Sequence, residues 1–110
     1  MKIALALIIP LCLAGAPLVA QAAGDAEAAK AKISMCIGCH GIPMYKTVFP
    51  EVYSVPMIAG QSPEYIVKAL RAYRSGERNH PSMRGIAKGL SDADMADVAA
   101  YYGRSAKAGK

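Results

Sequence analysis

The stretch Cys36-Ile37-Gly38-Cys39-His40 decides how this sequence is interpreted. Two thiols separated by two residues, with a histidine directly after the second, form the C-x-x-C-H pattern of covalent c-type haem attachment. At this spacing the thiols can reach the two vinyl groups on one edge of a porphyrin, and the histidine is held beneath the iron. The motif therefore predicts one haem c, joined to Cys36 and Cys39, with His40 as the proximal iron ligand.

Three other uses of the same residues compete with haem attachment. A thioredoxin-type dithiol normally lies at a helix N-terminus in a βαβ setting, whereas this motif follows a predicted helix. A structural zinc site needs four ligands, and residues 23–110 offer two Cys and two His. A disulfide between Cys36 and Cys39 would close a very short loop, which stabilises little. Haem attachment is favoured over all three.

The first 22 residues differ from the rest of the chain. Lys2 precedes an uncharged apolar run from Ile3 to Leu13, and small residues at 20 and 22 suit a signal peptidase. The run has roughly half of the ~20 residues that a transmembrane helix needs. We expect residues 1–22 to be a cleaved signal peptide, which would discard Cys12. The protein that remains is expected to have no membrane span. It is expected to be periplasmic, because c-type haem is attached after export.

Residues 23–110 are then expected to be one small domain. Without Lys2 the chain has 12 Lys and Arg against 8 Asp and Glu, a charge of about +4. Two haem propionates would lower the charge further, which does not fit the strongly basic profile of a nucleic-acid binder. A domain of this size buries only about 60–65% of its unfolded surface and commonly recruits a cofactor as additional core.

Helical patterns account for most of these residues, and strand-like alternation is absent. The clearest helix begins after Ser62, a hydroxyl N-cap followed by Pro63, and ends before Gly76. Irregular segments are expected over 41–61 and 77–90. Helices are predicted over 25–35, 63–75 and 91–102, the last stopped by Gly103, so the predicted fold class is all-α.

An ordered set of motifs resembles the class I c-type cytochromes, particularly the small bacterial cytochrome c553 and c4-like group. The resemblance implies a class I cytochrome c fold, in which helices wrap one covalently bound haem and the first and last helices cross. It also implies that the carbonyl of Pro56 accepts the proton on the second ring nitrogen of His40. The motifs that carry it are Cys36-Ile-Gly-Cys-His-Gly41, Pro56-Met-Ile-Ala-Gly-Gln61, Ser62-Pro-Glu-Tyr65, Leu70-Arg-Ala-Tyr-Arg-Ser-Gly-Glu-Arg78, Met83-Arg-Gly-Ile-Ala-Lys-Gly-Leu-Ser-Asp-Ala-Asp94 and Ala99-Ala-Tyr-Tyr102.

The distal iron ligand must come from a segment that reaches the other face of the haem. Met35 and Met44 are too close to the attachment site to cross the porphyrin. Met95 lies on the apolar stripe of the last predicted helix, where methionine more often fills the core. These three methionines are therefore poor candidates.

Two methionines remain for that role. Met57 follows Pro56 in a segment that the resembling family uses on the proximal side. Met83, 43 residues after His40, lies before the last predicted helix and matches the family's distal methionine. Met83 is the predicted ligand, and His80 or an open, water-ligated iron are the alternatives.

His/Met ligation raises the reduction potential relative to His/His ligation and leaves no iron position for a substrate. The expected function is therefore single-electron transfer, and the protein is not expected to be an enzyme. Expected partners are a dehydrogenase, a cytochrome complex or a terminal oxidase, met by a monomer or by a subunit of a complex. The alternatives are the haem subunit of a periplasmic dehydrogenase and, with an open distal site, a haem enzyme or sensor.

Two surface features remain open. The segment after His40 holds Tyr45, Phe49 and Tyr53 and is more apolar than the loop usual in the family, so we expect it to pack around the lower haem edge or to form a docking surface. A set of cations is expected to form a solvated helix face or to steer an acidic partner. These cations are Lys68, Arg71, Arg74, Arg78, Arg84 and Lys88.

Overall fold

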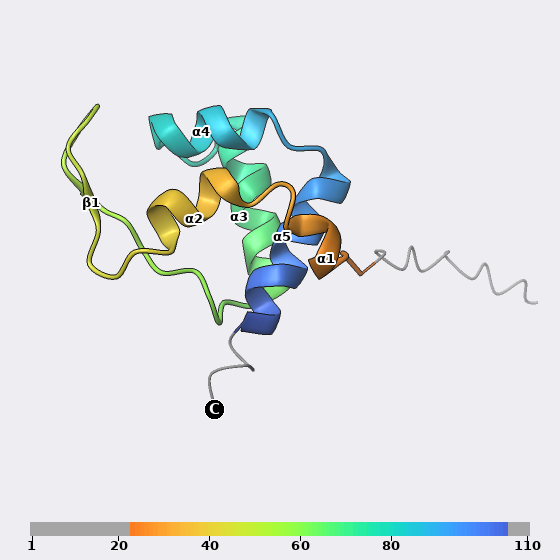
Figure 1. The fold of residues 1–110 in the computed structure, drawn as a ribbon. Helices are drawn as coiled ribbons and strands as arrows, with labels where there is room; N and C mark the ends of the chain where they lie inside the picture. The colour runs from red at the N-terminus through yellow and green to blue at the C-terminus, as the bar shows by residue number, and fades with distance from the viewer. Residues whose placement is uncertain (1–22, 106–110) are drawn as a thin grey trace, which may run out of the picture.

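The computed structural model describes residues 23–105. Residues 1–22, which carry the expected signal peptide and Cys12, lie outside that range. Figure 1 shows the helices gathered together, with a short hairpin projecting to one side. The elements are α1 (Ala26–Ala29), α2 (Ser34–His40), β1 (Lys46–Thr47), β2 (Tyr53–Ser54), α3 (Pro63–Ser75), α4 (Pro81–Lys88) and α5 (Asp92–Ser105).

The helix predicted over 25–35 is two helices. Asp25 caps α1 by accepting the backbone N–H of Glu27 at 2.8 Å, but α1 ends at Ala29. After a turn, α2 begins at Ser34 and contains the whole C-x-x-C-H motif. The prediction that the motif follows a helix is therefore wrong. The break lets α1 pack on α5 while α2 turns its cysteines toward the interior of the molecule.

Helix α3 has the predicted bounds. The Ser62 hydroxyl accepts the backbone N–H of Tyr65 at 3.2 Å, and Pro63 occupies the first helical turn. Gly76 ends the helix in the left-handed conformation, with φ of 90°. Both ends are determined by local sequence, which is why the sequence predicted them correctly.

The prediction of an irregular segment over 77–90 is wrong, because this segment contains α4. The ring of His80 caps this helix, with its Nδ1 accepting the backbone N–H of Met83 at 3.5 Å. Pro81 follows at the first helical turn, where a missing N–H costs nothing. Pro81 therefore starts a helix here instead of interrupting one.

Helix α5 continues past Gly103 to Ser105, so Gly103 does not stop it. The glycine serves a close approach instead. A Cβ at this position would lie 2.6 Å from Cγ of Pro63, at the start of α3. The first and last helices pack together as the resemblance implied, and α5 also packs on α3.

The segment after His40 is not wholly irregular, because β1 and β2 form an antiparallel pair in which Lys46 faces Ser54 and Thr47 faces Tyr53. This pair corrects the expectation that strands are absent, although the fold remains mainly helical. The hairpin tip, residues 48–52, carries Phe49 with 83% of its surface exposed. Phe49 is thus largely uncovered by the rest of the described chain, and whether it packs on the haem edge or forms a docking surface stays a prediction.

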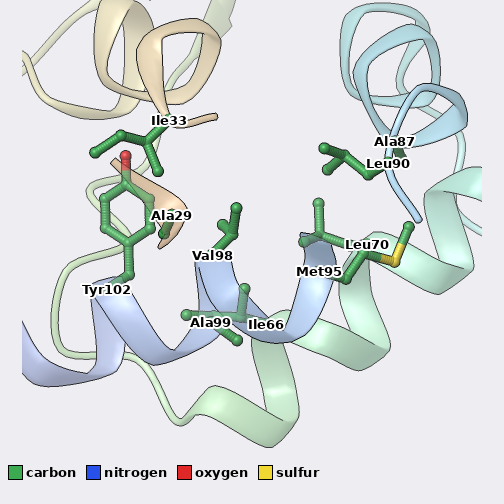
Figure 2. Packing of buried hydrophobic residues seen from close by; sticks show 10 residues of the cluster. All are labelled: Ala29, Ile33, Ile66, Leu70, Ala87, Leu90, Met95, Val98, Ala99 and Tyr102. Atoms are coloured by element: carbon green, nitrogen blue, oxygen red, sulfur yellow. The ribbon is translucent and has the colours of Figure 1, made fainter. Parts of the chain in front are cut away.

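The buried core lies where α1, α3, α4 and α5 meet (Figure 2). Met95 is completely buried, which confirms its prediction as core filler. Ala29 is also fully buried and lets α1 approach α5 closely. The core cluster comprises Ala29, Ile33, Ile66, Leu70, Ala87, Leu90, Met95, Val98, Ala99 and Tyr102.

Candidate functional site

The three residues of the attachment motif lie on one face of α2. Cys36, Cys39 and His40 are spaced at i, i+3 and i+4, and residues at these spacings are neighbours on a helix surface. All three line the same cavity. The helical conformation of the motif thus brings both thiols and the imidazole to a single site.

Further parts of the cavity wall come from α3 and α4. Ile66 and Leu70 of α3 contribute apolar surface, and Met83 contributes a thioether from the first turn of α4. The chain segment 55–58 closes another side. The cavity is therefore lined mostly by apolar side chains, with the imidazole of His40 coming from α2 and the thioether of Met83 from α4.

The orientation of the His40 ring is fixed by one hydrogen bond. Its Nδ1 lies 2.6 Å from the carbonyl oxygen of Pro56. A carbonyl can only accept, so Nδ1 carries the hydrogen and the neutral ring keeps its lone pair on Nε2. This is the tautomer that an iron ligand needs, and the contact is the one expected from the family resemblance.

The two cysteines are free thiols, not a disulfide. Burial raises the pKa of the Cys36 thiol. A dithiol redox centre requires the opposite shift, because the thiolate is the nucleophile. The local environment therefore does not favour the thioredoxin-type use of this pair.

The other candidate iron ligands lie in different surroundings. Met44 is 94% exposed and is not part of the cavity wall. Met35 and Met57 do line the cavity, but Met35 precedes the motif on α2 itself and Met57 adjoins Pro56 on the side of His40. His80 also lines it, with its Nδ1 engaged by the backbone N–H of Met83.

The polar rim of the cavity was not predicted from the sequence. Arg78 lines the cavity together with Tyr53 and Tyr65. The sequence placed Arg78 on a general basic face and Tyr53 in an irregular loop. Local pattern carried no signal for this grouping, because it depends on how the hairpin and the turn after α3 meet.

A haem c fits this site by its chemistry. The apolar walls suit a porphyrin, the paired thiols suit its vinyl groups, and an imidazole nitrogen and a thioether sulfur are available for the iron. Helices enclosing one such cavity, with a single C-x-x-C-H motif, define a c-type cytochrome with one haem.

Known proteins with similar sequences include c-type cytochromes. Cytochrome c-554(548) of Halomonas halodenitrificans is 42% identical over 89 residues, which cover 73% of this chain and 95% of that protein. Cytochrome c4 of Pseudomonas aeruginosa is 37% identical over 92% of this chain and 47% of its own length. The thiosulfate dehydrogenase electron acceptor of Thiomonas intermedia is 34% identical over 76% of this chain and 37% of its length. No protein-family model matches the chain.

The chain belongs to the class I c-type cytochromes, in the family of cytochromes c-554(548) and c4. It spans about half the length of the c4 relatives and nearly all of the c-554(548) relative. It is a monohaem electron carrier, with haem c bound through Cys36, Cys39 and His40. Within residues 23–105, no helix is long and apolar enough to cross a bilayer.

Proposed function

We propose that this cytochrome is a periplasmic carrier of single electrons whose iron is ligated by His40 and Met83. The observation that supports the proposal most directly is that one cavity receives His40 from α2 and Met83 from α4. The bound haem c supplies a one-electron Fe(III)/Fe(II) couple. Both axial positions are then filled by protein side chains, so no iron position is left for a substrate.

The residues around the ligands have separate tasks in this proposal. The carbonyl of Pro56 accepts a hydrogen bond from the Nδ1–H of His40 and thereby orients the ring and raises its basicity as a ligand. His80 caps α4 at the turn that carries Met83, which fixes the start of that helix. Cys36 and Cys39 hold the porphyrin edge in place.

Residues 1–22 are proposed to be a signal peptide that directs residues 23–110 to the periplasm. The support is compositional: one cation, a short apolar run and small residues at the cleavage positions. Mass spectrometry of the exported protein gives the new N-terminus directly. A mature chain that still contains Lys2 contradicts this part of the proposal.

The physiological donor is proposed to be a periplasmic dehydrogenase, with the cytochrome acting as its acceptor or as its haem subunit. The relative from Thiomonas intermedia, described as the electron acceptor of a thiosulfate dehydrogenase, supports this class of partner. The exposed apolar hairpin tip favours the subunit alternative, because residues 48–52 include Val48 at 78%, Phe49 at 83% and Val52 at 72% exposure.

We propose that the cations of the expected basic face contribute only modestly to steering an acidic partner protein toward the cytochrome. Arg74 lies 2.5 Å and Arg71 3.5 Å from carboxylate oxygens of Asp92, so two of the six cations on the expected basic face have an acidic partner. Lys68 and Lys88 form no ion pair within residues 23–105. These exposed cations can speed association with an acidic partner at low salt.

The decisive experiment is substitution of Met83. The ferric protein should show the weak red-edge absorption of sulfur-ligated low-spin haem, and Met83→Ala should abolish that band, lower the potential and admit carbon monoxide or cyanide. The matched controls are Met57→Leu and Met95→Leu, which should keep the band because these swaps conserve volume.

Two outcomes contradict the ligand assignment. If Met83→Ala keeps the band and Met57→Leu loses it, the wrong methionine has been assigned although electron transfer survives. If the unmutated protein is already high-spin and binds carbon monoxide readily, the distal site is open. A haem enzyme or sensor then becomes the better description.

A further inference from the structure

The first turn of α4, which carries Met83, is weakly anchored to the core. Ala87, in the second half of this eight-residue helix, is fully buried, and Leu90, just after the helix, is buried as well. At the other end none of residues 80–85 is buried, and Pro81 is exposed. The packing of α4 therefore fixes its C-terminal end, and the position of Met83 depends on contacts at the start of the helix.

The ring of His80 makes such a contact. Its backbone is extended, with φ of −152° and ψ of 113°, and its Nδ1 accepts the backbone N–H of Met83 at 3.5 Å. A hydrogen bond of this length is weak, because the usual donor-to-acceptor distance is about 2.9–3.0 Å. The residue is also only partly buried. The cap therefore depends on a second contact that holds the ring in place.

Tyr53 of β2 supplies that second contact. Its ring centroid lies 4.7 Å from that of His80, and the two ring planes meet at 76°. Edge-to-face arrangements of this kind are favoured, because the positive edge of one ring meets the negative face of the other. The Tyr53 hydroxyl forms no hydrogen bond with residues 23–105, so the ring carries the contact. Both side chains line the haem cavity.

The hairpin holds Tyr53 at this place. Thr47 faces Tyr53 across the strand pair, and the Thr47 hydroxyl donates to the Tyr53 carbonyl at 3.4 Å. Three residues after Tyr53, the carbonyl of Pro56 accepts the hydrogen bond from Nδ1 of His40. This short segment therefore reaches His40 through Pro56. It reaches the first turn of α4 through Tyr53.

We propose that Tyr53 is a positioning residue for the distal iron ligand: its ring holds the ring of His80, and His80 in turn caps the helical turn that presents Met83. The inference rests on the His/Met ligation of the proposed function and adds to it the residue that keeps the distal ligand in place. Tyr53 is not itself a ligand and acts through His80. The hairpin then supports both axial ligands of the iron, one through a hydrogen bond and the other through a ring contact.

Loss of the Tyr53 ring should increase the fraction of ferric protein in which Met83 is detached from the iron. A thioether favours ferrous iron, so detachment shows first in the ferric state. Added imidazole can bind the iron only while the thioether is off, and its rate of binding therefore reports the detached fraction. The free energy of one edge-to-face ring pair corresponds to about a two- to tenfold change in an equilibrium constant.

Five purified holocytochromes are compared with the unmutated protein: Tyr53→Val, Tyr53→Phe, His80→Ala, the double variant Tyr53→Val/His80→Ala and the control Phe49→Val. Valine suits a strand and phenylalanine keeps the ring. Phe49 is the matched control because it belongs to the same hairpin but is 83% exposed and does not line the cavity. Pyridine haemochrome spectra first establish that haem c is attached. Stopped-flow mixing of ferric protein with imidazole at one pH then gives the binding rate, and the red-edge band gives the sulfur-ligated fraction.

Tyr53→Val should bind imidazole about two- to tenfold faster than the unmutated protein and should show a weaker red-edge band. Tyr53→Phe and Phe49→Val should keep both values. His80→Ala should also bind imidazole faster, and adding Tyr53→Val to it should change the rate little, because the two residues act in series.

Three results overturn the proposal. They are an unchanged rate in Tyr53→Val, a rate in Tyr53→Phe or Phe49→Val as high as in Tyr53→Val, and additive effects of Tyr53→Val and His80→Ala. If Tyr53→Val yields no holoprotein, Tyr53→Leu replaces it with the same expected rate. If neither forms holoprotein while Phe49→Val does, Tyr53 is a structural residue of the hairpin and the proposal is wrong.

Failure of the proposed function gives a different result. If the unmutated ferric protein lacks the red-edge band and binds imidazole at once, the His/Met ligation itself is wrong. If Met83→Ala loses the band but Tyr53→Val leaves the imidazole rate unchanged, the ligation stands and the positioning role of Tyr53 alone is overturned.

Discussion

The imidazole of His40 and the carbonyl of Pro56 lie 2.6 Å apart although sixteen positions separate them in the chain. His40 is the last residue of α2, and Pro56 follows the hairpin, whose strands return the chain to the ring. The backbone N–H of Val55 donates to the carbonyl of Tyr45 at 2.9 Å and extends this return. The hairpin therefore sets the tautomer of a haem ligand.

Loosening this contact should raise the reduction potential. Pro56→Ala keeps the carbonyl but frees the backbone φ that proline fixes, so the oxygen is held less firmly against His40. A hydrogen bond worth about 1 kcal/mol limits the effect to about fivefold in the ferrous-to-ferric ratio. Pro43→Ala, at an exposed turn residue of the same segment, is the control in a spectroelectrochemical titration. A lower potential in Pro56→Ala contradicts the role assigned to the carbonyl.

The fold could be predicted where local sequence determines an element. Helix α3 has a hydroxyl cap, a proline at its start and a glycine at its end, so its bounds followed directly. The break between α1 and α2 could not be predicted, because it is set by contacts of Lys32 and Ile33 with distant parts of the chain. Helix α4 was missed because proline both starts and breaks helices, and sequence alone did not distinguish these roles.

The candidate site divides in the same way. The thiols and His40 belong to one short motif and were therefore predictable together. Met83 and Pro56 were expected from resemblance to a family, and the structure brings both to the cavity. Arg78 was missed because its position depends on the left-handed turn at Gly76 and on two tyrosines one and three turns back along α3.

Loss of both haem attachments should unfold the chain. Cys36→Ser or Cys39→Ser alone should leave one thioether and a less stable holoprotein, while the double variant should show little helix by far-UV circular dichroism. The reason is the small core, whose largest fully buried side chains are Met95 and Val98. Without haem the central cavity stays as exposed apolar surface. A helical, cooperatively unfolding double variant without haem contradicts this account.

Two glycines in helices should respond in opposite ways to alanine. A Cβ added at Gly85 of α4 would meet no other part of the structure within 4 Å. Gly85→Ala should therefore raise the free energy of unfolding by about 1 kcal/mol, because alanine has the higher helix propensity. A Cβ added at Gly103 of α5 would lie 2.6 Å from Cγ of Pro63. Overpacking of this kind costs about 1–3 kcal/mol. Thermal unfolding of the holoproteins should therefore give a raised Tm for Gly85→Ala and a lowered one for Gly103→Ala. Equal changes in Tm would show that the contact between α3 and α5 tolerates a methyl group.

Lys32, in the turn before α2, forms an ion cluster with Asp94 and Asp97 of α5. This cluster should make the free energy of unfolding fall at acid pH. Lys32 Nζ lies 2.6 Å from Asp94 and 2.8 Å from Asp97. Hydrogen bonds from Lys32 hold the pKa of each carboxyl below its usual 3.8, with further help from Ser91 for Asp94 and from the backbone N–H of Asp25 for Asp97. Each folded-state pKa is therefore lower than the unfolded one, so the folded protein binds fewer protons.

This shift fixes the sign of the pH dependence. The contribution is complete above the unfolded pKa of 3.8 and is lost as the pH falls through the lower folded values. Urea unfolding between pH 6 and pH 2 should therefore show a steep loss of stability on the acid side, and Lys32→Met should flatten that dependence. Lys30→Met is the matched control, since Lys30 pairs with Glu27 while both side chains are more than half exposed, at 60% and 76%. Acid also weakens iron ligation in every variant, so the comparison of Lys32→Met with Lys30→Met isolates the cluster. If the two variants lose stability in parallel as the pH falls, the link from Lys32 to α5 makes no specific contribution to folding.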